Sequence, residues 1–421
     1  MNHLERRSEA SGPADAASGR LAAASSPPAQ RGRTLAVLLT LLVAMGPMST
    51  DLYLPSLPGI ALDLAAPQSL VQLTIGLFIA GFAAMMLVCG PLADRFGRKP
   101  VLLGCMAIYV LASIACALSS GIGFLLAGRF VQALGACAGP VVGRAIVRDL
   151  YEPRDAGRIL GYMASAMALA PLVAPFLGGY LEVTFGWRAG FWFLAAYGVL
   201  VLAALWSRLE ETLPAPSVLS PSTLLVNYLH ILRDRTFLGF MLCVAFAFGA
   251  LFTWISNSAF VVISHFGVAP ERFGWSFGVV VAGYALGAYA GSRAGMRWGL
   301  RRATGIGVVT AALAGLGLAL AGWSAIGGLH AIVGLMATAF VGVGMVMPQS
   351  TAGALGPFPA LAGTASALLG FLQMMTGLVV NGLSSLWFDG TPRPMVSLNL
   401  ACALLALAAF WLLLSRRAAE A

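Results

Sequence analysis

One acidic residue, Asp51, lies well inside a long run of apolar residues. Inserting a charged side chain at the centre of a bilayer costs about 2.5–3.5 kcal/mol of free energy, so an acidic residue in such a run usually has a function. Asp51 lies about 17 residues, or ~25 Å of helix, from the start of its run, which predicts a site in the far half of the membrane. The alternative is a helix end wetted by the outside, because Pro55 and Pro58 follow closely.

Arg129 is the basic residue that matches Asp51 in depth. It lies in the fourth apolar run, which crosses in the opposite direction, about 10 Å below the same surface. A facing pair would relieve much of the insertion cost of both side chains, and Gln132, one helical turn away, shares the face of Arg129. We expect Asp51 to be ionised beside Arg129 in one state and to bind a proton in another, which predicts that Asp51 and Arg129 carry proton coupling.

Twelve apolar runs position these residues, and each is long enough to cross a hydrocarbon core of ~30 Å as a helix. The runs cover 34–57, 69–91, 100–119, 122–147, 157–182, 188–208, 236–262, 273–295, 303–323, 327–350, 362–387 and 394–414. The chain is 59% hydrophobic and only 10% charged, too few charges to cover the surface of a soluble protein. The sequence therefore predicts an all-α protein of the lipid bilayer with twelve transmembrane helices.

The longest internal polar stretch, 209–235, divides the runs six and six. We predict an N-terminal six-helix half over 34–208 and a C-terminal six-helix half over 236–414, joined by a central cytoplasmic loop. Residues 1–33, rich in Ala, Ser, Pro and Gly, are expected to form a disordered cytoplasmic tail, and residues 415–421 a second cytoplasmic tail.

Basic residues gather at alternate joints between the runs. The joints on one side hold only Arg188, Arg272 and Arg393. The other side holds Arg31, Arg33, Arg95, Arg98, Lys99, Arg148, Arg154, Arg158, Arg208, Arg233, Arg235, Arg293, Arg297, Arg301, Arg302, Arg416 and Arg417. This bias places both termini in the cytoplasm. The same bias accounts for the net charge of +9. A protein that binds nucleic acid would need a basic face or a known binding module, so we predict no nucleic-acid partner.

The cysteines and histidines do not form a reactive cluster. The six cysteines, all inside apolar runs, are Cys89, Cys105, Cys116, Cys137, Cys243 and Cys402. They lack metal-ligand spacing and are expected to pack between helices, so we predict no metal and no cofactor. The four histidines are dispersed and HExxH is absent, which argues against a membrane-embedded enzyme.

A charged motif joins the second and third runs, in the stretch Gly90-Pro-Leu-Ala-Asp-Arg-Phe-Gly-Arg-Lys. Its key residues are Gly90, Asp94, Arg95, Gly97, Arg98 and Lys99. Asp94 and Arg98 are four residues apart, as in a helical ion pair, and Gly97 permits a tight turn. The stretch resembles the signature Gly-x-Leu-Ala-Asp-Arg-x-Gly-Arg-Lys of the major facilitator superfamily. The resemblance implies the major facilitator fold and a cytoplasmic gate in which Asp94 lies near the start of the eleventh helix.

Two further motifs deepen the resemblance. Arg129-Phe-Val-Gln132-x-x-Gly135 resembles the fourth-helix motif of the superfamily, whose Arg is linked to proton coupling. The fifth-helix motif of the drug/proton antiporters resembles the stretch from Ala174 through Pro175, Gly178 and Gly179, although Ala174 stands where that motif has Gly.

Three stretches are similar to the bicyclomycin/chloramphenicol resistance (Bcr/CflA) branch, namely 50–58, 186–191 and 362–370. The resemblance implies proton-coupled efflux of drugs or other small molecules by alternating access, by a monomer in a bacterial inner (plasma) membrane, with the proton gradient as the energy source. A proton-coupled transporter of a specific metabolite on the same fold remains an alternative. A polytopic membrane enzyme is the alternative from another class.

The sequence gives weaker evidence for the residues that line the substrate cavity. Polar or aromatic residues within the runs that could line it are Tyr53, Gln132, Trp254, Asn257 and Gln373. Each could equally form hydrogen bonds between helices. The scarcity of charge within the runs favours neutral, cationic or zwitterionic amphipathic, drug-like substrates over polyanions.

Overall fold

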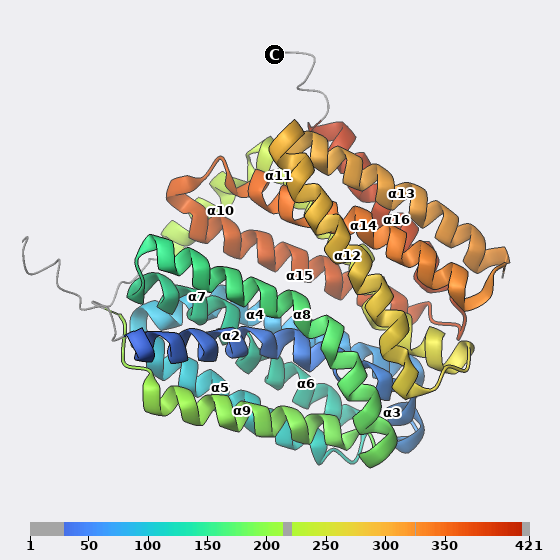
Figure 1. The fold of residues 1–421 in the computed structure, drawn as a ribbon, viewed down its shortest axis with the longest axis horizontal. Helices are drawn as coiled ribbons and strands as arrows, with labels where there is room; N and C mark the ends of the chain where they lie inside the picture. The colour runs from blue at the N-terminus through green and yellow to red at the C-terminus, as the bar shows by residue number, and fades with distance from the viewer. Residues whose placement is uncertain (1–28, 214–220, 325, 415–421) are drawn as a thin grey trace, which may run out of the picture.

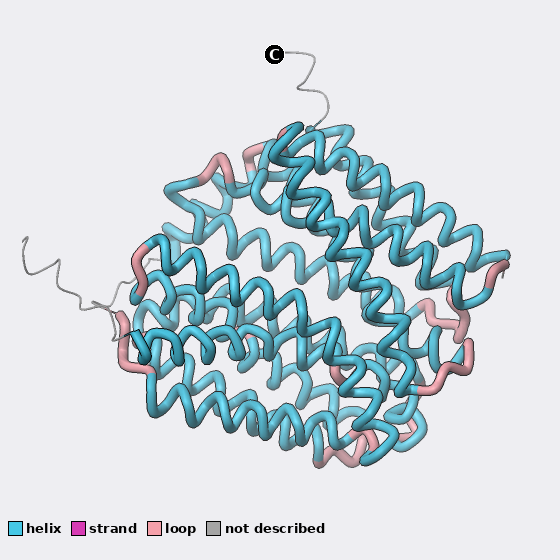
Figure 2. Tube along the Cα trace, in the orientation of Figure 1, coloured by secondary structure: helices cyan, strands magenta, loops and turns pink. Residues whose placement is uncertain are grey.

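The computed structural model describes residues 29–213, 221–324 and 326–414. These residues form helices joined by short loops (Figures 1 and 2). Within the described ranges, twelve helical segments are long and apolar enough to cross a membrane, as the sequence predicts. Of the N-terminal tail predicted to be disordered over 1–33, residues 1–28 lie outside the described residues, and residues 29–33 are helical instead. The predicted C-terminal tail, 415–421, also lies outside the described residues.

The first six spans form one half of the molecule. Its elements are α2 (Ala29–Asp51), the 3₁₀ turn η1 (Leu54–Ser56), α3 (Leu57–Asp63), α4 (Gln68–Phe96), α5 (Arg98–Ala117), α6 (Ile122–Ala136), α7 (Ala138–Leu150), α8 (Pro153–Phe185) and α9 (Arg188–Arg208). The first span comprises α2, η1 and α3, and the fourth comprises α6 and α7. The first span continues to Asp63, beyond its predicted end, because prolines 55 and 58 each occupy the first turn of a new helical segment, where proline is tolerated.

The last six spans form the second half. Its elements are α10 (Pro221–Leu232), α11 (Arg235–Ala259), the π-helical turn η2 (Phe260–His265), α12 (Pro270–Trp298), α13 (Leu300–Ser324), α14 (Gly328–Leu355), the 3₁₀ turn η3 (Pro359–Leu361), α15 (Ala362–Leu386), α16 (Arg393–Ala409) and the π-helical turn η4 (Phe410–Leu414). Helix α10 lies within the stretch predicted as a loop and packs on α15 and α11. The Asp234 carboxylate caps α11 by accepting a hydrogen bond from the Phe237 N–H (2.7 Å).

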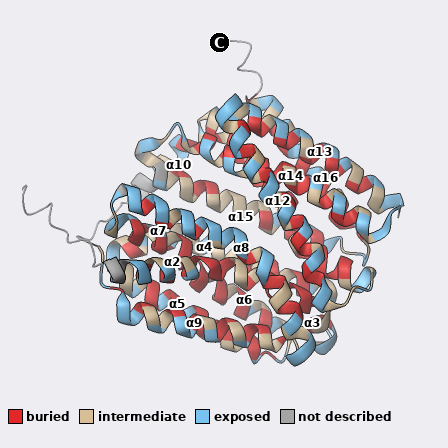
Figure 3. Ribbon diagram, viewed as in Figure 1, coloured by how far each residue is buried: buried red, intermediate tan, exposed pale blue. Residues whose placement is uncertain are grey.

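The two halves lie side by side, with the first drawn from blue to green and the second from yellow to red (Figure 1). They meet where α4 packs along α15 and α8 packs along α12. Exposed apolar side chains such as Leu111, Leu200 and Leu313 cover the outer surfaces of both halves (Figure 3). A lipid environment accepts such surfaces, since every backbone group of a helix is satisfied internally. We call the end of the bundle at which α2 starts and η4 finishes the terminal end, and the other the opposite end.

Candidate functional site

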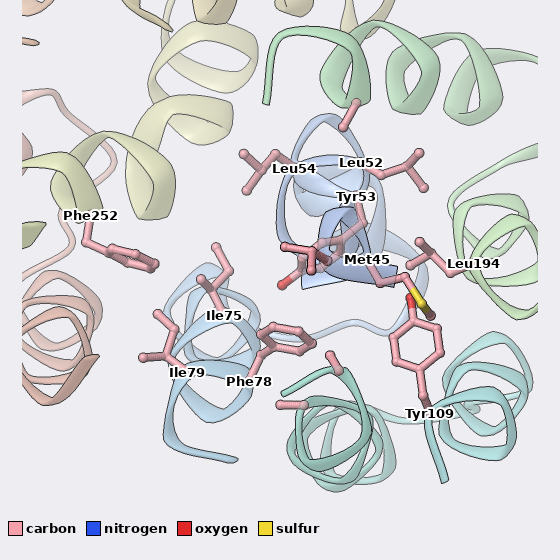
Figure 4. Close-up of a cluster of buried hydrophobic side chains, with 14 of the residues drawn as sticks. Met45, Leu52, Tyr53, Leu54, Ile75, Phe78, Ile79, Tyr109, Leu194 and Phe252 are labelled. Carbon is pink, nitrogen blue, oxygen red and sulfur yellow. The ribbon is translucent and has the colours of Figure 1, made fainter. Parts of the chain in front are cut away.

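The guanidinium group of Arg129, on α6, is fully buried among aromatic rings. Its central carbon lies 4.4 Å from the ring centre of Tyr53, 4.4 Å from that of Phe78 and 5.8 Å from that of Phe191. Figure 4 shows Tyr53 and Phe78 within a cluster of buried hydrophobic side chains. A cation over an aromatic face is attracted by the ring quadrupole, more strongly where water is excluded. The three rings therefore surround a positive charge that forms no ion pair with an acidic side chain among the described residues.

Arg129 also begins a short chain of hydrogen bonds. Its Nη1 donates to Gln132 Oε1 (2.6 Å), and Gln132 Nε2 donates to Ser113 Oγ on α5 (2.8 Å). The predicted common face of Arg129 and Gln132 is thus confirmed, as helical neighbours three residues apart. Two nitrogens of Arg129, Nε and Nη2, have no hydrogen-bond partner among the described residues.

The structure does not pair Asp51 with Arg129, and the prediction that the two face each other is wrong for this conformation. Asp51 is buried at the end of α2, and the Thr50 hydroxyl donates to its carboxylate (3.0 Å). In the described part of the chain, no basic nitrogen lies within 4.0 Å of the Asp51 carboxylate, so Asp51 forms no ion pair there. Asp51 is the last residue of α2, whereas Tyr53, against which Arg129 packs, lies in the turn between α2 and η1.

At the opposite end the halves are joined by buried amides. Gln72 Nε2 of α4 donates to Asn257 Oδ1 of α11 (3.2 Å), and Asn381 Nδ2 of α15 donates to the Gln72 carbonyl oxygen (3.3 Å). Asn381 Nδ2 also donates to Ser256 Oγ (2.8 Å). These three amide side chains are at most 1% exposed. We call Gln72, Asn257 and Asn381 the amide cluster, and it closes the space between the halves at this end.

The glycines of the fifth-helix motif lie at two close approaches of α8. A Cβ on Gly178 would lie 1.7 Å from the carbonyl oxygen of Leu52, next to Asp51. A Cβ on Gly179 would lie 2.4 Å from the carbonyl oxygen of Pro270, at the start of α12 in the other half. Only glycine fits at such distances, so this motif packs α8 against the turn that follows α2 and across the interface of the halves. Pro175 lies one turn earlier within α8.

Near the terminal end, a cavity of about 490 Å³ lies between the halves. The first half lines it with α4, α5, α7 and α8, and the second with α10 and α15. Met86 of α4 lines it, and its methyl group would lie 2.5 Å from a Cβ on Gly370 of α15. The size suits a small organic molecule. Its charged lining residues are Asp94, Arg98, Arg144 and Arg148, more charge than the sequence led us to expect.

The charged motif lies at the mouth of this cavity. Arg98 forms ion pairs with Asp94 and, through Nε, with Asp149 of α7 (3.1 Å). Gly97 between α4 and α5 has a φ of +101°, which favours glycine. Asp94 lines one wall and Gly363, near the start of α15, lines the other, without a hydrogen bond between them among the described residues. The predicted position of Asp94 near the start of the eleventh helix stays a prediction.

Glu211, which the sequence did not single out, completes the motif. Its carboxylate accepts hydrogen bonds from the backbone N–H groups of Arg98 (2.8 Å) and Lys99 (3.1 Å), at the start of α5. Partial burial opposes its ionisation, but these two donors and the N–H groups of Leu213 and Thr212 hold the pKa of Glu211 below its usual range. An anion at a helix N-terminus is also favoured by the helix dipole. The remaining motif residues, Gly90 and Arg95, lie on α4, and Arg95 stacks over Phe96 (5.2 Å).

None of the five residues predicted to bind substrate lines the cavity. Tyr53 donates to or accepts from Thr74 Oγ1 (2.5 Å), and Trp254 is fully buried against Phe277 (6.2 Å between ring centres). Asn257 belongs to the amide cluster, and Gln132 bonds to Arg129. Gln373 is half-buried on α15, with no hydrogen-bond partner among the described residues. Their roles in substrate binding stay predictions.

Comparison with known proteins now gives the family. Residues 37–381 match the model of the Major Facilitator Superfamily. The chain is 34% identical over 392 residues to the uncharacterized MFS-type transporter YdgK of Bacillus subtilis, covering 92% of this chain and 96% of that one. It is 30% identical over 392 residues to the bicyclomycin resistance protein homolog of Haemophilus influenzae, covering 92% and 98%. Multidrug resistance protein D of Escherichia coli is 30% identical over 360 residues, covering 85% and 90%.

Solved structures agree on the fold. A D-xylose–proton symporter superposes with a TM-score of 0.73 at 14% identity, covering 91% of this chain and 97% of that one. A bacterial homologue of the human lysosomal transporter Spinster, inward-facing and occupied, does so with a TM-score of 0.73 at 18% identity, covering 92% and 97%. The chain therefore belongs to the major facilitator superfamily, in the bicyclomycin/chloramphenicol resistance (Bcr/CflA) branch that its motifs resemble.

Proposed function

We propose that the protein exports small amphipathic, drug-like molecules across a bacterial inner membrane by alternating access, in exchange for protons. The relatives named for multidrug and bicyclomycin resistance support drug efflux. The observation that carries the alternating-access part is the asymmetry of the interface between the halves. The amide cluster closes one end, while a cavity of about 490 Å³ lies between the halves near the other.

The orientation of the molecule follows from its basic residues. Arg98, Lys99, Arg144 and Arg148 lie at the terminal end, which the positive-inside rule assigns to the cytoplasm together with both termini. On this assignment the cavity faces the cytoplasm, from which an exporter takes its cargo. The chain supplies both halves of the fold, so we propose a monomer that needs no cofactor beyond the proton gradient and catalyses no chemical reaction.

Asp51 is the proposed proton-binding residue. Its carboxylate is buried in the membrane span with the Thr50 hydroxyl as its hydrogen-bond donor and without an ion-pair partner in the described residues. An unpaired charge is costly there, and binding a proton removes that cost. Arg129 is proposed to act from its aromatic surroundings as a fixed positive charge. Two of its nitrogens lack a hydrogen-bond partner among the described residues and would bind one when the helices move.

Asp94 and Arg98 are proposed to work as a latch at the cytoplasmic end. In this conformation Arg98 forms ion pairs with Asp94 and Asp149, and Asp94 and the start of α15 line the same cavity. When the cavity closes, Asp94 would approach the N-terminus of that helix, where a negative charge is favoured. The latch would then hold the state that opens to the outside.

Expression in a drug-sensitive, efflux-deficient bacterium tests the proposal. A panel of amphipathic compounds should include some whose minimum inhibitory concentration rises at least fourfold with the wild-type chain. The Asp51→Asn variant, checked for equal amounts in the membrane, should lose that protection. If no compound in a broad panel is exported, or if the variant protects equally well, the proposed function is contradicted.

A further inference from the structure

The cavity near the terminal end has two chemically different walls. On the first-half side, α7 contributes the guanidinium groups of Arg144 and Arg148. On the second-half side, α10 and α15 contribute the hydroxyl-bearing residues Tyr228, Thr364 and Ser366. One wall is therefore positively charged, and the other offers neutral hydrogen-bond donors.

The charges on the first wall do not cancel. Arg98 is committed to Asp94 and Asp149, and Asp94 is the only acid that lines the cavity among the described residues. Neither Arg144 nor Arg148 forms an ion pair with a described residue. The cavity thus contains two arginines whose charge no neighbouring carboxylate neutralises.

The geometry of α7 presents both arginines to the same ligand. Positions 144 and 148 are four residues apart and share one helix face, and like charges in that relationship repel each other. The Nε of Arg144, a residue that lines the cavity, donates to the carbonyl oxygen of Pro140 (2.5 Å), so this bond uses one of its three nitrogens. An anion between the two guanidinium groups would relieve their repulsion and accept several charge-assisted hydrogen bonds.

We infer that this cavity is a subsite for an anionic group of the transported molecule, with Arg144 and Arg148 as its binding residues. The substrate class it assigns is the amphipathic monoanion or zwitterion: a carboxylate or sulfonate on a compact apolar body. The inference rests on the proposed export function, whose substrate side it specifies.

The rest of the cavity suits the apolar body. Met86, Leu87, Val141 and Leu160 line it, and methionine adapts to irregular shapes. An anion bound to α7 that also reaches the hydroxyl groups of α10 and α15 would bridge the two halves, and so favour closure of the cavity around it. A membrane potential that is negative inside also favours the export of an anion.

Binding of three matched probes to the purified full-length protein tests this inference. The probes are 1-naphthoate, its neutral amide 1-naphthamide and the cation 1-naphthylmethylammonium, measured by calorimetry in nanodiscs of phosphatidylcholine. The wild type should bind naphthoate at least tenfold more tightly than the amide or the cation. R144Q and R148Q should each reduce that preference at least fivefold, whereas R144K should keep most of it. Unchanged binding of naphthamide in each variant shows that the cavity remains folded.

Three results would overturn the inference: tighter binding of the amide or the cation than of naphthoate, equal naphthoate affinity in the wild type and R144Q, or loss of naphthoate binding when phosphatidylglycerol replaces part of the phosphatidylcholine. The last result would assign the arginines to a lipid headgroup. The drug-sensitivity assay separates this outcome from failure of the proposed function. Export of neutral or cationic drugs without naphthoate selectivity would refute only the anionic subsite, whereas absence of any export would refute the transport proposal itself.

Discussion

The guanidinium carbon of Arg129 lies 4.4 Å from the ring centre of Tyr53, two residues after the buried Asp51. The acid and the base are therefore connected through the chain and an aromatic ring, not through an ion pair. Movement of η1, which begins just after Tyr53, would alter the surroundings of both. This relationship makes the interactions of Arg129 with its rings, rather than a fixed salt bridge, the part of the site to perturb first.

The Arg129→Lys variant should lose at least tenfold in proton-driven export while remaining folded. An ammonium group cannot both lie flat between the Tyr53 and Phe78 rings and donate to Gln132, and each cation–π contact contributes about 0.5–2 kcal/mol. Transport by everted membrane vesicles measures the effect. Arg293→Lys is the matched control, because Arg293 stacks on Tyr289 (4.8 Å) away from the site. Equal loss in both variants would speak against a specific role for Arg129.

Gly178→Ala should destabilise the protein by about 1–3 kcal/mol, as expected for overpacking. The added methyl group would meet the Leu52 carbonyl oxygen at 1.7 Å, so α8 must move away from the end of α2. Thermal unfolding in detergent measures the change. Gly161→Ala on the same helix has no atom within 4 Å of the new Cβ and should leave the midpoint unchanged. A Gly178→Ala protein as stable as the wild type would contradict the close approach.

The Gln72→Leu and Asn381→Leu variants should favour the state that is open at the opposite end. Each removes a buried hydrogen bond between the halves, worth about 0.5–1.5 kcal/mol. Spin labels at Leu62 and Leu386, two exposed residues of the two halves at that end, report the opening by pulsed distance measurement. The population with the longer distance should rise severalfold.

A matched control for the amide cluster is Asn399→Leu. Asn399 is also a buried amide, but its Nδ2 donates to the Ala250 carbonyl oxygen (3.1 Å) and to Thr253 Oγ1 (3.2 Å), both within the second half. Its loss should destabilise that half without changing the distance between the labels. If all three variants give the wild-type distance distribution, the amide cluster does not hold the opposite end closed.

Glu211→Gln should lower stability at neutral pH by about 0.5–1 kcal/mol, a small figure because solvent screens the exposed carboxylate. The folded protein holds the pKa of Glu211 below its usual range, so its stabilisation is complete above the unfolded value of about 4.3 and fades as the pH falls through the folded value. Unfolding midpoints of the wild type and the variant should therefore differ at pH 7 and converge in acid. A difference that persists unchanged below pH 4 would exclude the carboxylate charge as the cause.

The sequence predicted what depends on local hydropathy and on motifs. All twelve spans were predictable because each needs only its own run of apolar residues, and Gly97 because a turn between charged helix ends needs a positive φ. The depths of Asp51 and Arg129 could be estimated from the rise of 1.5 Å per residue. The direction in which each side chain points could not, because it depends on how α2 rotates against α6.

Contacts between distant segments were beyond the sequence for the same reason. Glu211 reaches Arg98 across 113 positions, and the amide cluster draws its members from three helices. No local sequence pattern shows whether Asn257 lines a cavity or forms a hydrogen bond between helices, as it does with Gln72. The net positive charge of the cavity could not be predicted either, because it depends on α7 and α15 lining the same cavity.

The most direct test of proton-coupled export is substrate movement in proteoliposomes across an imposed pH step, using the first compound that the drug panel identifies. The wild type should transport at least tenfold faster with the gradient than without it. Asp51→Asn should show no acceleration while still exchanging labelled for unlabelled substrate at equal pH, because its helices can move but its proton site is gone. Full acceleration by the gradient in Asp51→Asn would contradict the account.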